Sequence, residues 1–193
     1  MTTTREQILQ TTSTLLEKQG FHGTGLNEIV KESGAPKGSL YHYFPAGKDQ
    51  IASEAVLQSG KITAERILAG LAYRNKASKA IYDFVLEIAE NVERSGFASG
   101  GPLTSVAMET ATQSERINSA CREAYGMIES AFRDKLLDTG FAAGKAEELA
   151  TFITASIEGG IILSRTYHSG DPLRSVAKQL KSLLAQKSLE VKE

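Results

Sequence analysis

The chain has 193 residues, of which 41% are hydrophobic and 23% charged, and its 22 basic and 23 acidic residues give a formal net charge of −1. This composition excludes a wholly disordered chain, which would lack apolar residues for a core, and a basic coat for nucleic acid. Its length predicts one large or two small domains. The single cysteine, Cys121, excludes an internal disulfide and a multi-cysteine zinc site. Because we find no signal peptide and no membrane-spanning run, we expect a cytoplasmic protein.

Apolar residues recur at helical spacing along almost the whole chain, and no segment alternates convincingly with a period of two. This pattern predicts an all-α fold. The breaks are Gly20, the segment 33–36, the segment 44–47 and the loop 95–102. The predicted helices cover residues 4–19, 26 to the break at 33, 37–43, 48–72, 77–93, 103–112, 114–139, 144–167 and 171–186.

The first fifty residues have the pattern of a helix-turn-helix unit, because two short helices joined by a glycine-containing turn follow a longer helix. The side chains predicted to form its core are Ile8, Leu15, Leu16, Leu26, Ile29, Val30, Leu40 and Phe44. The third helix then leaves Lys37, Ser39, Tyr41 and His42 outside, with Gly38 allowing close approach. These residues offer a cation, hydroxyls and an imidazole to phosphates and base edges.

Charge in this segment is balanced, since residues 1–50 contain five basic and five acidic side chains. A DNA-binding segment without net charge has to gather its cations on one face, and Lys37 and Lys48 are placed to do so. Lys48 begins the fourth predicted helix, whose free N–H groups also favour a phosphate.

Residues 34–44, GAPKGSLYHYF, followed by Lys48-Asp49, resemble the DNA-binding signature of TetR-family transcriptional repressors. The preceding TGLNEIV at residues 24–30 fits the same pattern, and the N-terminal resemblance covers residues 4 to about 65. The turn contains Ala35-Pro36, and one extra residue precedes Lys48. In both features the sequence resembles the LmrA/YxaF-like subgroup. The segments 101–102 and 157–161 extend a weaker resemblance to the end of the chain.

The resemblance implies an all-α, TetR-like homodimer of about nine helices per subunit. Its helix-turn-helix DNA-binding domain covers residues 1–50, with the start of the fourth helix to about residue 65. A ligand-binding and dimerisation domain covers residues 51–193. The implied function is a ligand-responsive repressor that binds a palindromic operator and is released by a small apolar, flavonoid-like effector. The implied DNA contacts are Thr24, Lys37, Gly38, Ser39, Tyr41, His42, Tyr43 and Lys48. Only Arg5 is basic near the N-terminus, so a basic arm in the minor groove is not expected.

The middle helices offer more apolar and aromatic side chains than a thin bundle needs, and gaps between bundle helices often hold ligands. The residues predicted to line a pocket are Phe84, Ile88, Val106, Met108, Cys121, Tyr125, Ile128 and Phe132. Tyr125 is the best polar candidate, because a buried phenol seeks a hydrogen-bond partner. The alternative for each of these residues is an ordinary place in the core.

The last two helices carry more apolar side chains than one side of a monomer would bury. The residues predicted to face a second copy are Phe152, Ile153, Ile157, Gly159, Gly160, Ile161, Tyr167, Val176, Leu180 and Leu184. A glycine inside a helix costs about 1 kcal/mol relative to alanine, and the close approach of another backbone would explain two of them. Packing within the subunit is the alternative.

No cofactor or metal site is expected. The sequence Gly23-Thr24-Gly25 lacks the third glycine of a dinucleotide-binding loop and follows no strand. The three histidines have none of the spacings of metal ligands. Cys121 is either a redox sensor or, as is more typical of an apolar helix face, an inert core thiol. No catalytic constellation is present, so we expect no enzyme. The alternative function is a small-molecule-binding helical protein, or an enzyme, with a vestigial DNA-binding head.

Overall fold

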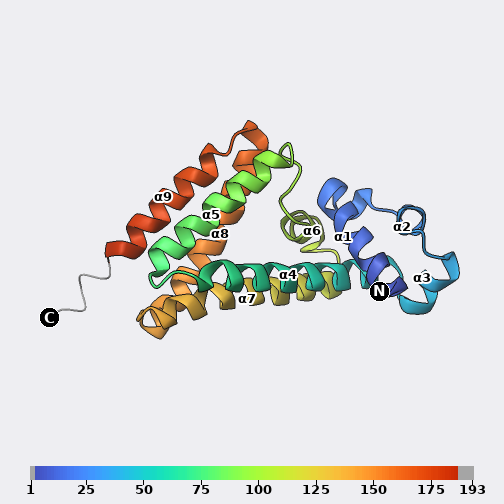
Figure 1. Cartoon of the computed structure of the whole chain (residues 1–193). Helices are drawn as coiled ribbons and strands as arrows, with labels where there is room; N and C mark the ends of the chain where they lie inside the picture. Colours follow the sequence, from blue (N-terminus) through green and yellow to red (C-terminus); the bar gives the residue numbers. More distant parts are fainter. Residues whose placement is uncertain (1–2, 187–193) are drawn as a thin grey trace. The chain divides into compact units, whose positions relative to one another are not determined.

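The structure, a computed structural model, describes residues 3–186, and this range contains nine α-helices and no strand (Figure 1). Helices account for 82% of the described residues. Their bounds are α1 (Thr4–Gly23), α2 (Leu26–Ser33), α3 (Lys37–Tyr43), α4 (Lys48–Ala72), α5 (Ala77–Arg94), α6 (Leu103–Thr110), α7 (Glu115–Asp138), α8 (Ala143–Tyr167) and α9 (Asp171–Gln186). The predicted all-α fold is confirmed, and no helix in residues 3–186 combines the length and hydropathy needed to span a bilayer.

The end of α1 differs from the prediction. Gly20 was expected to stop the helix, but it forms a kink at φ +73° and the helix resumes as far as Gly23. A side-chain hydrogen bond bridges the kink, because the Thr24 hydroxyl donates to the Gly20 carbonyl at 2.7 Å. The other end has a capping box, in which the Thr3 hydroxyl and the Glu6 carboxylate each accept from the other's backbone N–H.

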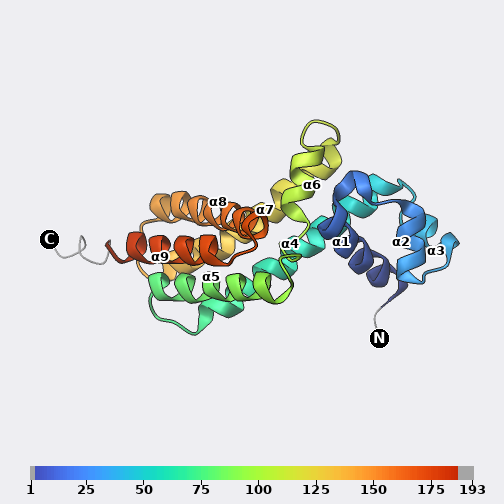
Figure 2. The same ribbon diagram turned by 90° about the horizontal axis from the view of Figure 1, so that it is seen from above.

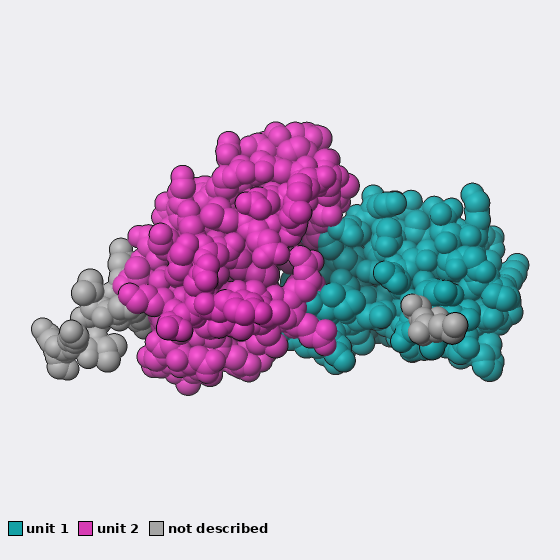
Figure 3. Space-filling model, in the orientation of Figure 1, with its two compact units in different colours: residues 1–62, 101–127 teal, residues 63–100, 128–193 magenta. Residues whose placement is uncertain are grey.

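Contacts between residues divide the chain into two compact units (Figure 3). The first contains described residues 3–62 and 101–127, and the second contains residues 63–100 and 128–186. Helices α4 and α7 each contribute residues to both units. Helix α6 belongs to the first unit, although it follows α5 in the chain.

The core of the first unit is built around α1, α2, α3 and the start of α4. Six of the eight predicted core side chains are buried, and the other two, Leu26 and Val30, are half-buried. Gly60 lets α4 approach α7 closely, because a Cβ there would lie 2.5 Å from the Cβ of Ala124.

In the second unit, α9 packs against both α5 and α8 (Figure 2). Each helix presents one apolar stripe to the others, as its 3.6-residue periodicity predicts. The buried side chains include Ile81, Val85 and Val92 of α5, Ile153 and Ile157 of α8, and Leu173, Leu180 and Leu184 of α9.

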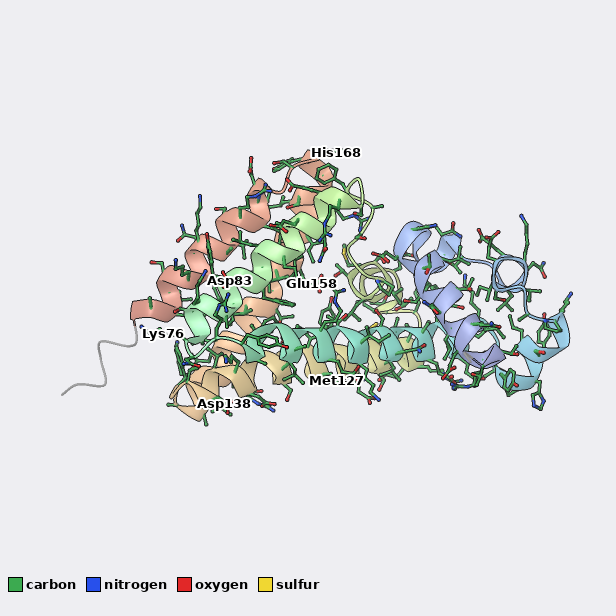
Figure 4. The ribbon with its side chains drawn as sticks, in the orientation of Figure 1. Lys76, Asp83, Met127, Asp138, Glu158 and His168 are labelled. Atoms are coloured by element: carbon green, nitrogen blue, oxygen red, sulfur yellow. The ribbon has the colours of Figure 1, made fainter. Side chains whose placement is uncertain are left out.

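An ion pair, a backbone hydrogen bond to the same carboxylate and an aromatic contact link the ends of helices in the second unit. Arg174 at the start of α9 forms a forked ion pair with Glu93 near the end of α5, with N–O distances of 2.9 and 2.5 Å. The same carboxylate accepts the Gly170 N–H at 3.1 Å. The ring of His168, which follows α8, packs edge-on against Phe97 at 5.2 Å between centroids (Figure 4).

Candidate nucleic-acid interface

Helix α3 is short, and two buried anchors decide which of its faces is exposed. Leu40 and Phe44 lie four residues apart, on one side of the helix, and both are fully buried in the first unit. The turn before α3 depends on Gly34, which ends α2 in a left-handed conformation at φ +64°. The opposite face of α3 must therefore point outward.

The outward face of α3 carries most of the predicted contact residues. Lys37, Gly38 and His42 are exposed, as are Tyr41 (49%) and Tyr43 (38%). The rings of His42 and Tyr43 pack edge to face at 5.1 Å. A Cβ at Gly38 would meet nothing within 4 Å, so the backbone itself is accessible there.

Three predicted contact residues, Thr24, Ser39 and Lys48, are less exposed than the others, and Thr24 requires a correction. Ser39 is half-buried. Thr24 is only 1% exposed, and its hydroxyl already donates to the Gly20 carbonyl. A hydroxyl has a single hydrogen to donate. The Thr24 side chain therefore closes the kink of α1 and is not available as a donor to a phosphate.

Lys48 occupies the first position of α4, after the turn at Gly47 (φ +73°). Its side chain is half-buried, and its Nζ lies 4.3 Å from the centroid of the Phe21 ring, a cation–π contact. Burial lowers the pKa of Lys48, whereas the carboxylates of Asp49 and Glu109 act to raise it. The Lys48 ammonium, at the start of α4, thus lies over the ring of Phe21, near the end of α1.

Sequence reasoning missed the contacts that α6 and the loop before it make in the first unit. The carboxylate of Glu109 accepts the His22 N–H at 2.8 Å, across 87 positions of sequence. The Gly101 N–H donates to the Glu17 carboxylate at 2.8 Å. No local pattern could have paired these residues, because their partners are far away in the chain.

The predicted pocket residues lie in both units. Phe84, Ile128 and Phe132 are buried in the second unit, where the rings of Phe84 and Phe132 pack edge to face at 6.1 Å; Ile88 is half-buried. In the first unit, Val106 and Cys121 are buried and Tyr125 is half-buried. The predicted need of Tyr125 for a partner is met by Thr104, whose hydroxyl lies 3.3 Å from the phenol oxygen.

The structure changes two expectations for these residues: that Met108 lines a pocket and that Cys121 is a redox sensor. Met108 is 76% exposed, so its side chain is not enclosed by the described residues and we leave it out of the proposed lining. Cys121 is 3% exposed, and burial raises the pKa of its thiol to about 11. The thiol is therefore protonated at neutral pH, which does not suit a redox sensor.

The residues predicted to face a second copy fall into two groups. Phe152 (52%) and Tyr167 (64%) are exposed, and Gly159, Ile161 and Val176 are half-buried. The other predicted residues, Ile153, Ile157, Gly160, Leu180 and Leu184, are already buried within the chain.

Gly160 in particular has a partner inside the subunit. A Cβ there would lie 2.9 Å from Leu173 Cδ2 of α9, so packing within the chain explains this glycine. A Cβ at Gly159 would meet nothing within 4 Å. The prediction missed Ile162 (46%), which is exposed on α8 like Leu163 (44%).

The exposed apolar residues of α8 lie on one side of the helix by their spacing. We call this surface the outer face of α8 and define it by Phe152, Gly159, Ile162, Leu163 and Tyr167.

Among residues 3–186 no group of three or more histidine, cysteine, aspartate or glutamate side chains is placed to hold a metal ion.

Comparison with known proteins gives two matches to families. Residues 8–55 match the family of bacterial regulatory proteins, tetR family, and residues 77–179 match the family described as transcriptional regulator LmrA/YxaF-like, C-terminal domain. The HTH-type transcriptional regulator YxaF of Bacillus subtilis (strain 168) is 43% identical over 183 residues, which are 95% of this chain and 96% of the relative. The HTH-type transcriptional regulator LmrA of the same organism is 39% identical over 180 residues, 93% of this chain and 96% of the relative.

A shorter match and two solved structures agree with these relatives. The HTH-type transcriptional repressor NemR of Escherichia coli (strain K12) is 51% identical over 41 residues, 21% of either chain. The crystal structure of E. coli NemR in its reduced form has a TM-score of 0.83 at 23% identity, covering 94% of this chain and 98% of that one. A TetR transcriptional regulator from Legionella pneumophila has a TM-score of 0.80 at 19% identity, covering 95% and 98%. At these identities the two structures show the shared fold.

Proposed function

Because the chain belongs to the TetR family of DNA-binding transcriptional regulators, with a C-terminal domain of the LmrA/YxaF-like type, we propose that it is a ligand-responsive repressor. In this proposal a dimer binds a palindromic operator in the bacterial cytoplasm. Binding of a small apolar effector then releases the dimer from the operator. NemR, to which this chain is similar over 41 residues, is a repressor by name, and this supports the proposed direction of control.

The outward face of α3 carries the proposal. Lys37, Tyr41, His42 and Tyr43 are exposed because Leu40 and Phe44 hold the helix from behind. A lysine, two phenols and an imidazole on one short helix supply donors and acceptors for the edges of bases in a major groove. Lys48 adds a cation for a backbone phosphate, and the first N–H groups of α2, which have no partner within the helix, offer a second anchor for a phosphate.

The proposed dimer is supported by the outer face of α8. Its large side chains, Phe152, Ile162, Leu163 and Tyr167, are each between 44% and 64% exposed. Water contact with such a surface is unfavourable, and a second copy would remove it. A two-fold dimer would present two α3 helices to successive major grooves about 34–36 Å apart, which is the spacing of a palindromic site.

The proposed effector site uses the predicted lining residues of the second unit, which are all apolar: Phe84, Ile88, Ile128 and Phe132. An apolar, flavonoid-like molecule fits such a lining better than a charged one. To release the operator, it has to bind the DNA-free conformation more tightly than the DNA-bound one. A coupling free energy of about 1–3 kcal/mol would change DNA affinity about 5- to 150-fold.

The direct test is footprinting of the purified protein on the DNA that flanks its own gene, with and without a set of apolar ligands. A two-fold symmetric footprint that a ligand abolishes is the expected result. Replacement Lys48→Ala should weaken binding to the footprinted site and to random duplex DNA by similar factors, and reduce the salt slope by about one unit. The matched control is Lys178→Ala, an exposed lysine of α9 in the second unit, which should leave the salt slope unchanged.

The alternative class is a small-molecule-binding helical protein, or an enzyme, with a vestigial DNA-binding head. It predicts that the wild-type protein binds no duplex in a salt-dependent way. In that case ligand binding would persist without a footprint, and the repressor proposal would be wrong.

A further inference from the structure

Glu109, the second-to-last residue of α6, contacts the kink of α1 in the first unit. Its Oε2 accepts the His22 backbone N–H at 2.8 Å. A Cβ at Gly20 would lie 1.9 Å from its Oε1. The φ of +73° at Gly20 disfavours other residues, and a side chain there would displace the Glu109 carboxylate from this position.

The backbone on both sides of Phe21 is fixed by this arrangement. On one side the Thr24 hydroxyl donates to the Gly20 carbonyl, and on the other the Glu109 carboxylate accepts from His22. The Phe21 ring between them is 9% exposed, and the Lys48 ammonium lies over it at 4.3 Å from the centroid. The hydrogen bond from His22 to Glu109 therefore restrains the backbone next to the ring over which the ammonium lies.

Glu109 also acts on Lys48 through its charge. Burial disfavours the charged form of Lys48, and the negative charge of Glu109, together with that of Asp49, favours it. A phosphate contact needs the ammonium both charged and in place. The hydrogen bond of Glu109 to His22 and the charge of Glu109 therefore both favour a charged Lys48 ammonium over the Phe21 ring.

We propose that Glu109 is a positioning residue for DNA binding, which fixes the Phe21 platform on which Lys48 is presented to a backbone phosphate. The affinity of the helix-turn-helix unit for DNA then depends on a residue of α6, in a part of the chain that follows α5. The inference rests on the proposed DNA-binding function and on the phosphate contact of Lys48 in particular.

A double-mutant cycle tests whether Glu109 acts through Lys48. The probe is a random-sequence 30-base-pair duplex at several salt concentrations, with wild type, Glu109→Ala, Lys48→Ala and the double variant. Glu109→Ala alone should weaken binding several-fold and reduce the salt slope toward that of Lys48→Ala. In the Lys48→Ala background the same change should have no further effect.

Two further variants keep the test sharp. Glu109→Gln retains an oxygen that can accept the His22 N–H, so it should keep most of the binding that Glu109→Ala loses, and its difference from wild type measures the contribution of the Glu109 charge. Its matched control is Glu123→Gln, an exposed glutamate of α7 in the same unit, which measures the general effect of removing one negative charge. If Glu109→Ala unfolds, Phe21→Leu replaces it in the cycle, because it removes the ring and keeps an apolar side chain.

The outcomes separate the inference from the function beneath it. Equal fold losses from Glu109→Ala in the two backgrounds would mean that Glu109 supports the fold in general, and would overturn the inference while DNA binding stands. A wild-type protein that binds no duplex at low salt would overturn the proposed function itself.

Discussion

Two glycines of the first unit should respond in opposite ways to alanine. Gly60 is buried in α4, where a Cβ would lie 2.5 Å from the Cβ and 2.8 Å from the Cα of Ala124 in α7. Gly126 is exposed in α7, and a Cβ there would meet nothing within 4 Å. The two changes, Gly60→Ala and Gly126→Ala, have the same effect on composition and differ only in what the new methyl group meets.

The expected magnitudes follow from that contact. Each change gains about 0.8–1.0 kcal/mol of helix propensity. Carbon atoms pack at about 3.5–4.0 Å, so the methyl group at Gly60 is about 1 Å too close to a backbone atom that cannot rotate away. Overpacking of this kind costs about 1–3 kcal/mol, and a rigid neighbour places it in the upper part of that range. We therefore expect Gly60→Ala to lose about 1–2 kcal/mol of unfolding free energy and Gly126→Ala to gain about 1 kcal/mol.

Urea unfolding at one fixed protein concentration measures both values. For a chain of this length, 1 kcal/mol corresponds to about 2–4 °C in melting temperature, so thermal melts should separate the variants by several degrees. If Gly60→Ala proved as stable as Gly126→Ala, the close approach of α4 and α7 at Ala124 would be wrong.

Three other predictions use different measurements. The forked pair with Arg174 holds the pKa of Glu93 below its ordinary value of 4.5. Its stabilising effect is therefore complete above that value and lost as the pH falls through the lowered pKa, so Glu93→Gln should flatten the acid side of a stability–pH curve; an unchanged curve would contradict the pair. Gly159→Ala should raise the dissociation constant of the proposed dimer in analytical ultracentrifugation at least tenfold, whereas an unchanged constant would mean that no partner approaches there. Cys121 should resist thiol reagents at pH 8 until urea unfolds the chain, and rapid labelling of the native protein would show that the thiol is accessible.

The sequence predicted much of the architecture because helical periodicity records which residues face a core. Leu40 and Phe44, four residues apart, were enough to predict the outward face of α3. The capacity of glycine to break a helix located most boundaries. At Gly20 the same rule gave the wrong result, because a left-handed residue can also kink a helix that then continues when a side chain such as Thr24 closes it.

Periodicity identifies a buried face but not the partner that covers it. For that reason Gly160, which packs against Leu173 of its own chain, was assigned to a contact with a second copy. Met108 was assigned to a pocket because methionine is apolar, although its side chain is exposed. The bond between Glu109 and His22 joins positions 87 residues apart, and only the folded chain brings them together.

The outer face of α8 has a consequence for how the protein responds to dilution. If the proposed dimer forms through this face, a separated subunit leaves Phe152, Ile162, Leu163 and Tyr167 in water, and dimer formation then stabilises the folded chain. The melting temperature should then rise with protein concentration. In a cell that makes few copies, the number of dimers would depend on expression level more steeply than in direct proportion, so halving synthesis would remove more than half of them.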